Sequence, residues 1–128
     1  MLTASPVQNK IEQKEAAVAC GFPFRPDSFA YSQKEDGVLI AAAQFDITSD
    51  GGVFTDIAMV KGLEDDVEAL FILGRAVLNF LDLAGIDSCT FDSRDAHGEK
   101  MARMLGFKND GITWRIVLKG LFDGKCHN

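Results

Sequence analysis

The chain has 128 residues, of which 47% are hydrophobic and 25% are charged. This size and composition are typical of a chain with one hydrophobic core, so we expect residues 1–128 to form a single domain. The formal net charge is −6 and the sequence pI is about 4.8. Nucleic acids and anionic membranes attract clustered lysine and arginine, which this acidic chain does not offer. The composition therefore argues against both as partners.

Three cysteines, Cys20, Cys89 and Cys126, are an odd number with wide spacing. They do not form the pattern of a disulfide framework, which predicts a reducing, cytoplasmic setting. Cys126 and His127 are adjacent near the end of the chain and lack the spacing of a zinc site, so we expect no metal site. The longest apolar stretch, residues 69–86, contains polar residues that predict no membrane span.

The N-terminal third predicts one helix and one hairpin. Ser5 followed by Pro6 is a helix-start signal, because the hydroxyl can cap free amides and proline suits the first turn. We therefore expect a helix over residues 6–20. The strand-like runs 28–33 and 38–47 flank a turn that ends in Asp-Gly, which is a strong hairpin signal.

A second glycine-containing turn, residues 48–52, leads into a third strand at residues 53–60. Both faces of this strand are largely apolar, which predicts a central strand covered on each side. Strict alternation would place Val53, Thr55, Ile57 and Met59 on one face, and Phe54, Asp56, Ala58 and Val60 on the other.

The spacing of apolar residues becomes helical over residues 64–84. The polar residues form one narrow stripe, so most of this helix should be buried. Phe71, Leu78 or Phe80 could remain for a second copy of the chain, which makes a homodimer one expectation and burial within the domain the other. The remaining elements are a strand at 88–91, a helix at 95–105 that stops at Gly106, and a strand at 112–118.

Two local strings resemble the GNAT superfamily of acyl-CoA-dependent N-acyltransferases. Residues 74–78, Gly-Arg-Ala-Val-Leu, look like the start of the family's cofactor helix, and residues 104–107, Met-Leu-Gly-Phe, look like the end of its penultimate helix. The resemblance covers residues 28–118. It implies an α+β fold of GNAT type, with a mixed central sheet and helices on both faces. The family's N-terminal strand is expected to be missing.

The family holds the cofactor pyrophosphate in a turn of pattern Gln/Arg-x-x-Gly-x-Gly/Ala, where backbone amides and a helix N-terminus face the anion. Gly74 matches the last position, but Ile72 and Ala69 stand at the other two. The connection is also about four residues longer, close to one helical turn. We expect the helix to begin near Glu64, to fill the pyrophosphate space and to present acids there. Gly74 would then be a packing position inside a helix.

The resemblance also directs attention to a base and a cofactor edge. The family's tyrosine acid is absent, because Ala102 occupies the matching position, while Asp56 on the central strand is the candidate general base. The alternative for Asp56 is a wet strand edge or an ion pair with a cation such as Arg75. The backbone of Ile57, Ala58, Met59 and Val60 would bind the amides of pantetheine, and the chain around Gly74 and Arg75 would add what it can.

Two functions remain open at this point. One is an acyltransferase that uses acetyl-CoA or another acyl-CoA and acts on an amine of a small molecule or a protein. The other is a non-catalytic module that keeps the fold to bind a partner or a small ligand. His97 has no nucleophile motif beside it, so we expect it to be a solvated residue near a helix start.

Overall fold

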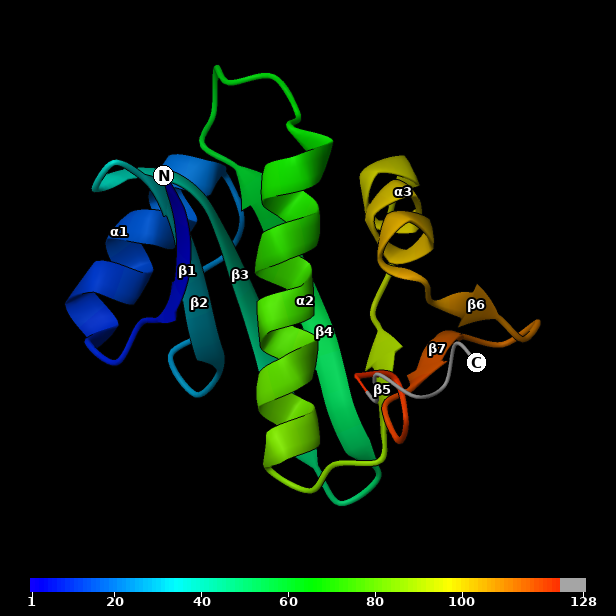
Figure 1. Ribbon diagram of the computed structural model, residues 1–128. Coiled ribbons are helices and arrows are strands. Elements are labelled where there is room, and N and C mark those ends of the chain that lie inside the picture. The colour runs from blue at the N-terminus through cyan, green and yellow to red at the C-terminus, as the bar shows by residue number, and fades with distance from the viewer. Residues whose placement is uncertain (123–128) are drawn as a thin grey trace.

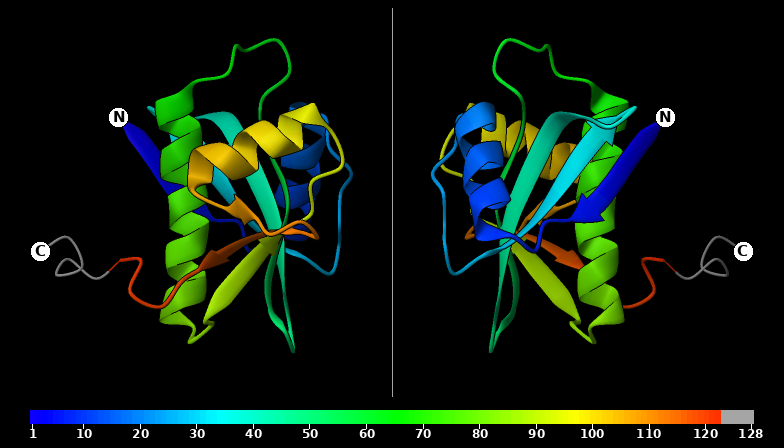
Figure 2. Two further views of the ribbon diagram at one scale, coloured as in Figure 1. Left: turned by 90° about the vertical axis from the view of Figure 1, so that its right-hand side faces the viewer. Right: turned by 90° about the vertical axis from the view of Figure 1, so that its left-hand side faces the viewer.

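A mixed β-sheet runs through the middle of the computed structural model, which describes residues 1–122 (Figure 1). The strand order is β1-β2-β3-β4-β5-β7-β6. Helix α1 covers one face, and α2 and α3 cover the other (Figure 2). The predicted α+β class with helices on both faces is therefore confirmed. The elements are β1 (Leu2–Pro6), α1 (Lys10–Cys20), β2 (Phe29–Glu35), β3 (Val38–Thr48), β4 (Gly51–Met59), α2 (Val67–Leu83), β5 (Ser88–Phe91), α3 (Ala96–Leu105), β6 (Lys108–Asn109) and β7 (Trp114–Val117).

The expectation that the N-terminal strand is missing is wrong. Residues 2–6 form β1, which pairs antiparallel with β2 along its whole length. Pro6 ends this strand at the sheet edge, where a residue without an N–H costs no ladder hydrogen bond. Helix α1 begins four residues later than predicted, because the side chain of Asn9 caps it by accepting hydrogen bonds from the amides of Ile11 and Glu12.

The hairpins of the N-terminal half follow the sequence prediction, and a parallel crossover comes after them. Asp36 and Gly37 both have positive φ, at 49° and 85°, which suits the tight turn between β2 and β3. Strand β4 pairs antiparallel with β3 and parallel with β5. Helix α2 makes the crossover between β4 and β5, which puts it against the sheet.

A β-bulge in β4 overturns the predicted faces of this strand. Gln44 pairs with Asp56 and the next residue of β3 pairs with Phe54, which leaves Thr55 as an extra residue. The alternation therefore shifts by one position. Phe54 and Ile57 pack on the side of α2, whereas Asp56 takes part in contacts on the side of α1.

Helix α2 begins at Val67, not near Glu64 as the sequence predicted. Asp66 is its N-cap, with extended backbone and a side chain that accepts a hydrogen bond from the amide of Ala69 at 3.1 Å. Gly62 has a φ of 92° in the preceding turn. The acidic residues thus form a loop before the helix, because an aspartate cap competes with an additional helical turn.

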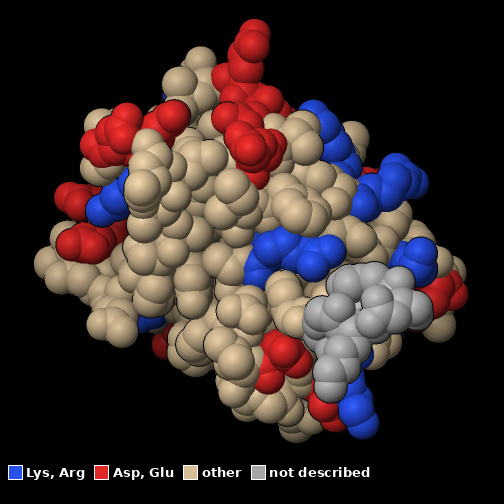
Figure 3. Space-filling view, viewed as in Figure 1, with Lys and Arg blue, Asp and Glu red and all other residues tan. Residues whose placement is uncertain are grey.

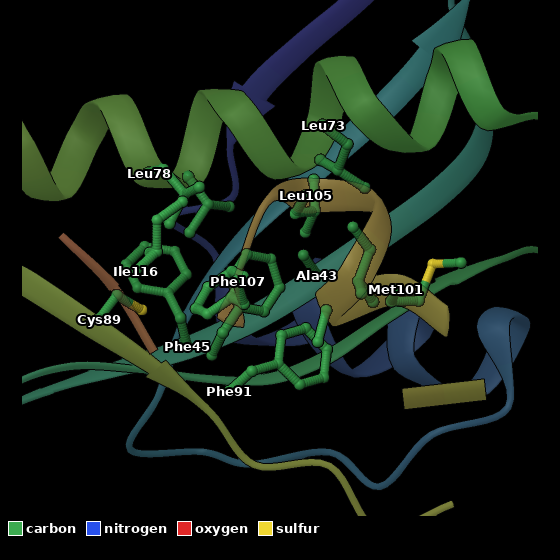
Figure 4. Packing of buried hydrophobic residues seen from close by; sticks show 14 of the residues in the cluster. Ala43, Phe45, Leu73, Leu78, Cys89, Phe91, Met101, Leu105, Phe107 and Ile116 are labelled. Atoms are coloured by element: carbon green, nitrogen blue, oxygen red, sulfur yellow. The ribbon is translucent and has the colours of Figure 1, made fainter. Parts of the chain in front are cut away.

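The larger hydrophobic core lies between the sheet and the pair α2 and α3. Phe54 stacks on Phe91 with ring centroids 5.2 Å apart, and Phe107 meets both rings edge-on. Figure 4 shows Phe91 and Phe107 side by side beneath α2. Gly74 lies inside α2, where an added Cβ would collide with the side chain of Leu105. The prediction of Gly74 as a packing position in a helix is confirmed.

The three apolar residues of α2 that were predicted as possible dimer contacts differ in their burial. Leu78 is fully buried in the core, and Phe80 packs in an aromatic cluster with Phe29 and Phe45. Phe71 is 38% exposed. Burial within the domain, the second alternative, therefore holds for Leu78, while Phe80 is only partly buried against the core.

Two further expectations concern membranes and metals. Over residues 1–122, no helix is both long and apolar enough to cross a bilayer. The same residues contain no group of three or more His, Cys, Asp or Glu side chains that could hold a metal ion. Cys126 and His127 lie outside the described residues.

Candidate functional site

A cleft of about 450 Å³ opens where β4 and β5 separate. Its walls come from the second half of β4, the β4–α2 loop, the segment after α1, the loop after β5 and the first turn of α3. The residues Asp56, Ile57, Ala58, Met59 and Val60, all predicted from the sequence as site residues, line this cleft. The structure therefore brings the candidate base and the candidate strand edge together.

Asp56 lies on the wall of the cleft and is held by three donors. Its Oδ2 accepts hydrogen bonds from Arg25 Nε at 2.7 Å and from Gln44 Nε2 at 3.0 Å, and its Oδ1 accepts one from Arg94 Nη2 at 3.1 Å. The Asp56 side chain is only 4% exposed. Among the alternatives for Asp56, an ion pair is what the structure contains, with Arg25 and Arg94 in the place suggested for Arg75.

A buried amide network supports this ion pair from behind. Gln13 on α1 donates from Nε2 to Oε1 of Gln44 at 3.0 Å, and both side chains are almost fully buried. The hydrogen bond to Asp56 raises the pKa of Arg25 above its ordinary value. Each polar group in this network has a partner, which fixes the orientation of the carboxylate.

Two β4 carbonyls beyond the last β5 pairing are bound by side chains. Arg94 Nη2 donates to the carbonyl oxygen of Thr55 at 2.6 Å. His97 Nε2 lies 2.9 Å from the carbonyl oxygen of Ile57, so this nitrogen must carry the proton and donate. His97 is exposed and lies in the first turn of α3, as the sequence predicted, and its hydrogen bond to β4 is an addition that the sequence did not predict.

Acidic residues surround the N-terminus of α2, where an anion would otherwise be favoured. Figure 3 shows acidic side chains gathered at the top of the molecule, over the β4–α2 loop and the start of α2. The side chain of Asp66 accepts the hydrogen bond of the Ala69 amide, and Glu68 lies in the first turn of the helix. Asp65 forms an ion pair with Lys100 at 3.1 Å. The residues present at this end of α2 do not fit an acyl-CoA diphosphate.

Gly74 and Arg75 are not among the residues that line the cleft. Gly74 packs on Leu105, and the Arg75 guanidinium stacks between the rings of Phe71 and Phe122 at 4.9 and 5.6 Å. The helix start that the sequence resemblance suggested at these residues lies two turns earlier in the structure, at Val67. Their grouping with the strand edge of β4 is therefore not what the structure shows.

Cys20 also lines the cleft, but its chemistry is unsuited to nucleophilic attack. Burial raises the pKa of its thiol to about 11, so almost none of it is thiolate near neutral pH. It packs with Ala16 and Ala42 in a small cluster under α1. Its role in the cleft wall is that of a small apolar side chain.

Sequence reasoning missed the groups that complete the site: Gln13, Arg25, Gln44, Arg94 and His97. They come from five separate segments and carry no motif. The β-bulge that turns Asp56 toward them has no sequence signal either. A buried polar position such as Gln44 within the apolar run of β3 was the single local hint.

The fold and this cleft define a class of protein: the chain has the fold of the GNAT acetyltransferases. No protein-family model matches the sequence, and no curated protein matches it. Solved structures do match, with low sequence identity over nearly the whole chain. The likeness therefore establishes the fold, and the divergence of the sequence is large.

Three of these structures illustrate the likeness. The ribosomal-protein-S18-alanine N-acetyltransferase from Escherichia coli is 13% identical with a TM-score of 0.66, over 91% of this chain and 90% of that one. A GNAT family acetyltransferase from Brucella melitensis in complex with acetyl-CoA is 14% identical with a TM-score of 0.66, over 91% and 88%. Mutant forms of the spermidine/spermine N-acetyltransferase from Vibrio cholerae are 10% identical with a TM-score of 0.69, over 94% and 96%.

Proposed function

We propose that the chain is an acetyltransferase-like protein whose cleft binds a small ligand without anchoring the diphosphate of acyl-CoA at α2. The observation that carries this proposal is the acidic N-terminus of α2, where Asp66 caps the helix with its own carboxylate. Asp65 and Glu68 add further negative charge at the same end. The function is thus that of a non-catalytic binding module built on an enzyme fold.

The electrostatic cost supports this proposal. An acid about 6 Å from a phosphate charge repels it by roughly 0.7 kcal/mol even at the dielectric constant of water. Several acids near one diphosphate therefore offset what a helix N-terminus contributes, which is typically about 0.3–1 kcal/mol for a charge at an exposed helix end. The pairing of Asp65 with Lys100 relieves part of this repulsion, and the Asp66 cap still competes for an amide.

A calorimetric titration with acetyl-CoA tests the proposal. The wild-type protein should show no saturable heat and no rise in unfolding temperature with millimolar acetyl-CoA. A matched variant carrying Asp65→Asn, Asp66→Ser and Glu68→Gln removes three charges but keeps a capping hydroxyl. Weak binding by this variant alone would support the charge argument, whereas saturable binding by the wild type would overturn the proposal.

A second candidate function is an acyl-CoA-dependent N-acyltransferase with an altered cofactor site. The specific observation in its favour is the position of Asp56 in the cleft, next to the edge residues Ile57 to Val60. In this hypothesis Asp56 would accept the proton of an amine on a small molecule or a protein. Its two oxygens already accept three hydrogen bonds, whereas a base needs a free lone pair to take a proton.

A thiol-release assay with acetyl-CoA and a panel of amines tests this second candidate. It predicts turnover by the wild type and loss of turnover in Asp56→Asn, which keeps the size of the side chain. Turnover that survives in Asp56→Asn would remove Asp56 from the catalytic role. No turnover with any amine would favour the binding module.

We also propose that α2 provides a homodimer contact, now through a different set of exposed residues that shares only Phe71 with the set predicted from the sequence. Phe71, Ile72 and Leu83 on α2 are 38%, 37% and 79% exposed. A mass in solution of twice 13.9 kDa, lost in Leu83→Lys, would support this contact. A strictly monomeric species at high concentration would reject it.

A further inference from the structure

The two ends of β4 differ in what lies beside them. Strand β5 pairs with β4 only at Gly52, Val53 and Phe54. The amide of Asp92 then donates to the carbonyl oxygen of Phe54 at 2.9 Å. After this hydrogen bond, β4 and the segment that follows β5 separate around the cleft. The second half of β4 is therefore an open strand edge inside a cavity. Such an edge accepts hydrogen bonds from any extended chain that carries amide N–H groups.

Side chains bind two carbonyls of this edge. Arg94 donates a hydrogen bond to the carbonyl oxygen of Thr55, and His97 donates one to that of Ile57. Arg94 is also bound to Asp56 at 3.1 Å and lies 3.9 Å from Asp92. Within residues 1–122, the Ile57 carbonyl is the one hydrogen-bond partner of the His97 ring. His97 is thus the less firmly held of the two.

A helix cap and close packing hold the backbone on either side of His97, whereas the His97 side chain can change rotamer. Asp95 caps α3 by accepting a hydrogen bond from the amide of Gly98 at 2.9 Å. Gly98 also lies so close to Ser93 that an added Cβ would be 3.2 Å from the Ser93 Cα. The His97 side chain itself is exposed, and exposed side chains change rotamer in picoseconds to nanoseconds.

We propose that His97 is an autoinhibitory contact: its ring occupies the Ile57 carbonyl, and a ligand with amide N–H groups must displace it to add to the edge of β4. This proposal rests on the small-ligand function proposed above for the same cleft. The ligand with which His97 competes is an extended chain with amide groups, the class that the GNAT resemblance implies for this strand edge. Nε2 donates in the tautomer that faces Ile57, so a ligand that competes for this carbonyl releases the contact.

Binding of pantetheine, an uncharged chain with two amides, tests the proposal in three forms of the protein. His97→Ala removes the competing donor, and His97→Gln keeps a side-chain N–H that can reach a backbone carbonyl. A net hydrogen bond changes an equilibrium constant by about 2-fold to about 10-fold. We therefore expect His97→Ala to bind pantetheine tighter than the wild type by this factor, and His97→Gln to bind like the wild type.

A second readout follows the ring directly. The nitrogen chemical shifts of His97 should move toward those of a solvated ring as pantetheine is added to the wild type. Equal or weaker binding by His97→Ala, or no binding by any form, would overturn the proposal. The acetyl-CoA titration separates this failure from that of the proposed function: saturable acetyl-CoA binding by the wild type sinks the latter, whatever pantetheine does.

Discussion

The two halves of β4 contain the same kind of backbone but satisfy it in different ways. From Gly52 to Phe54 the strand has a neighbour on each side, and its inward side chain, Phe54, is fully buried among aromatic rings. From Thr55 to Met59 one neighbour is lost, and Arg94 and His97 supply donors instead. Strand pairing requires only backbone, whereas the cleft half depends on particular side chains. The first half therefore determines stability, and the second can determine binding.

The largest effect is expected in the paired half, from Phe54→Ala. Phe54 is fully buried and stacks on Phe91, so its truncation should lower the free energy of unfolding by about 3–5 kcal/mol. Denaturant unfolding measures this change. Val38→Ala, at a 65% exposed position on β3, is the control and should change stability by less than about 0.5 kcal/mol. A small loss for Phe54→Ala would show that the ring stack does not stabilise this half.

A smaller effect is expected in the cleft half, from Asp56→Ala. This change leaves Arg25 and Arg94 without their carboxylate, and both arginines are partly exposed, so water compensates part of the loss. We expect a loss of about 1–3 kcal/mol in unfolding free energy. Asp92→Asn, at a side chain that is 53% exposed, should be nearly neutral. Equal effects of the two changes would contradict the described network.

Gly74→Ala tests the close contact between α2 and α3 on the paired side. Overpacking against Leu105 should cost about 1–3 kcal/mol, and the better helix propensity of alanine returns up to about 1 kcal/mol. The net loss is therefore small but measurable by thermal unfolding. Leu105→Ala in the Gly74→Ala background should show a non-additive gain, because the smaller side chain removes the collision. Strict additivity of the two changes would argue against the contact.

The smallest effect is expected at alkaline pH, from two buried thiols on opposite faces of the sheet. Burial raises the pKa of Cys89 to about 12 and that of Cys20 to about 11, from an ordinary value of 9.0. Because the folded state holds the neutral form, this stability is full below pH 9 and is lost as pH rises toward 11–12. By pH 10 each thiol should cost about 1 kcal/mol of unfolding free energy. Cys89→Ala should flatten the pH dependence between pH 9 and 11, and an unchanged slope would contradict the burial.

The elements that depend on local sequence were predicted, and those that depend on long-range contacts were not. The hairpins, the crossover helix and the strand Ser88–Phe91 follow from turn residues and periodicity, which are local. The start of α2 was predicted too early because Asp66 could be either a residue of the first helical turn or the N-cap. The sequence does not decide between these two roles, and in the structure Asp66 is the N-cap. The missed strand β1 forms through pairing with β2, a contact across about 30 residues that local propensity does not encode.

The site was predicted only where it depends on the strand itself. Asp56 and the edge from Ile57 to Val60 were predicted because the GNAT resemblance implies a basic carboxylate and a cofactor-binding backbone on the central strand, and these residues line the cleft. The partners of Asp56 lie 12 to 38 positions away along the chain. Nothing in their local sequence distinguishes a cleft arginine from a solvated one, so tertiary structure alone could identify them.

Thr55 is the bulged residue of β4, and it determines which face of the sheet the following side chains point to. If Thr55 paired with β3 as an ordinary strand residue, Asp56 would face the aromatic rings and Ile57 would turn toward α1, so the core and cleft positions after Phe54 would be exchanged. Comparison of this protein with others of its fold therefore has to count residues from the bulge, and not from the nearest glycine motif. An alignment with a chain that lacks this bulge needs a one-position gap at Thr55, because without the gap core and cleft positions are exchanged throughout the rest of β4.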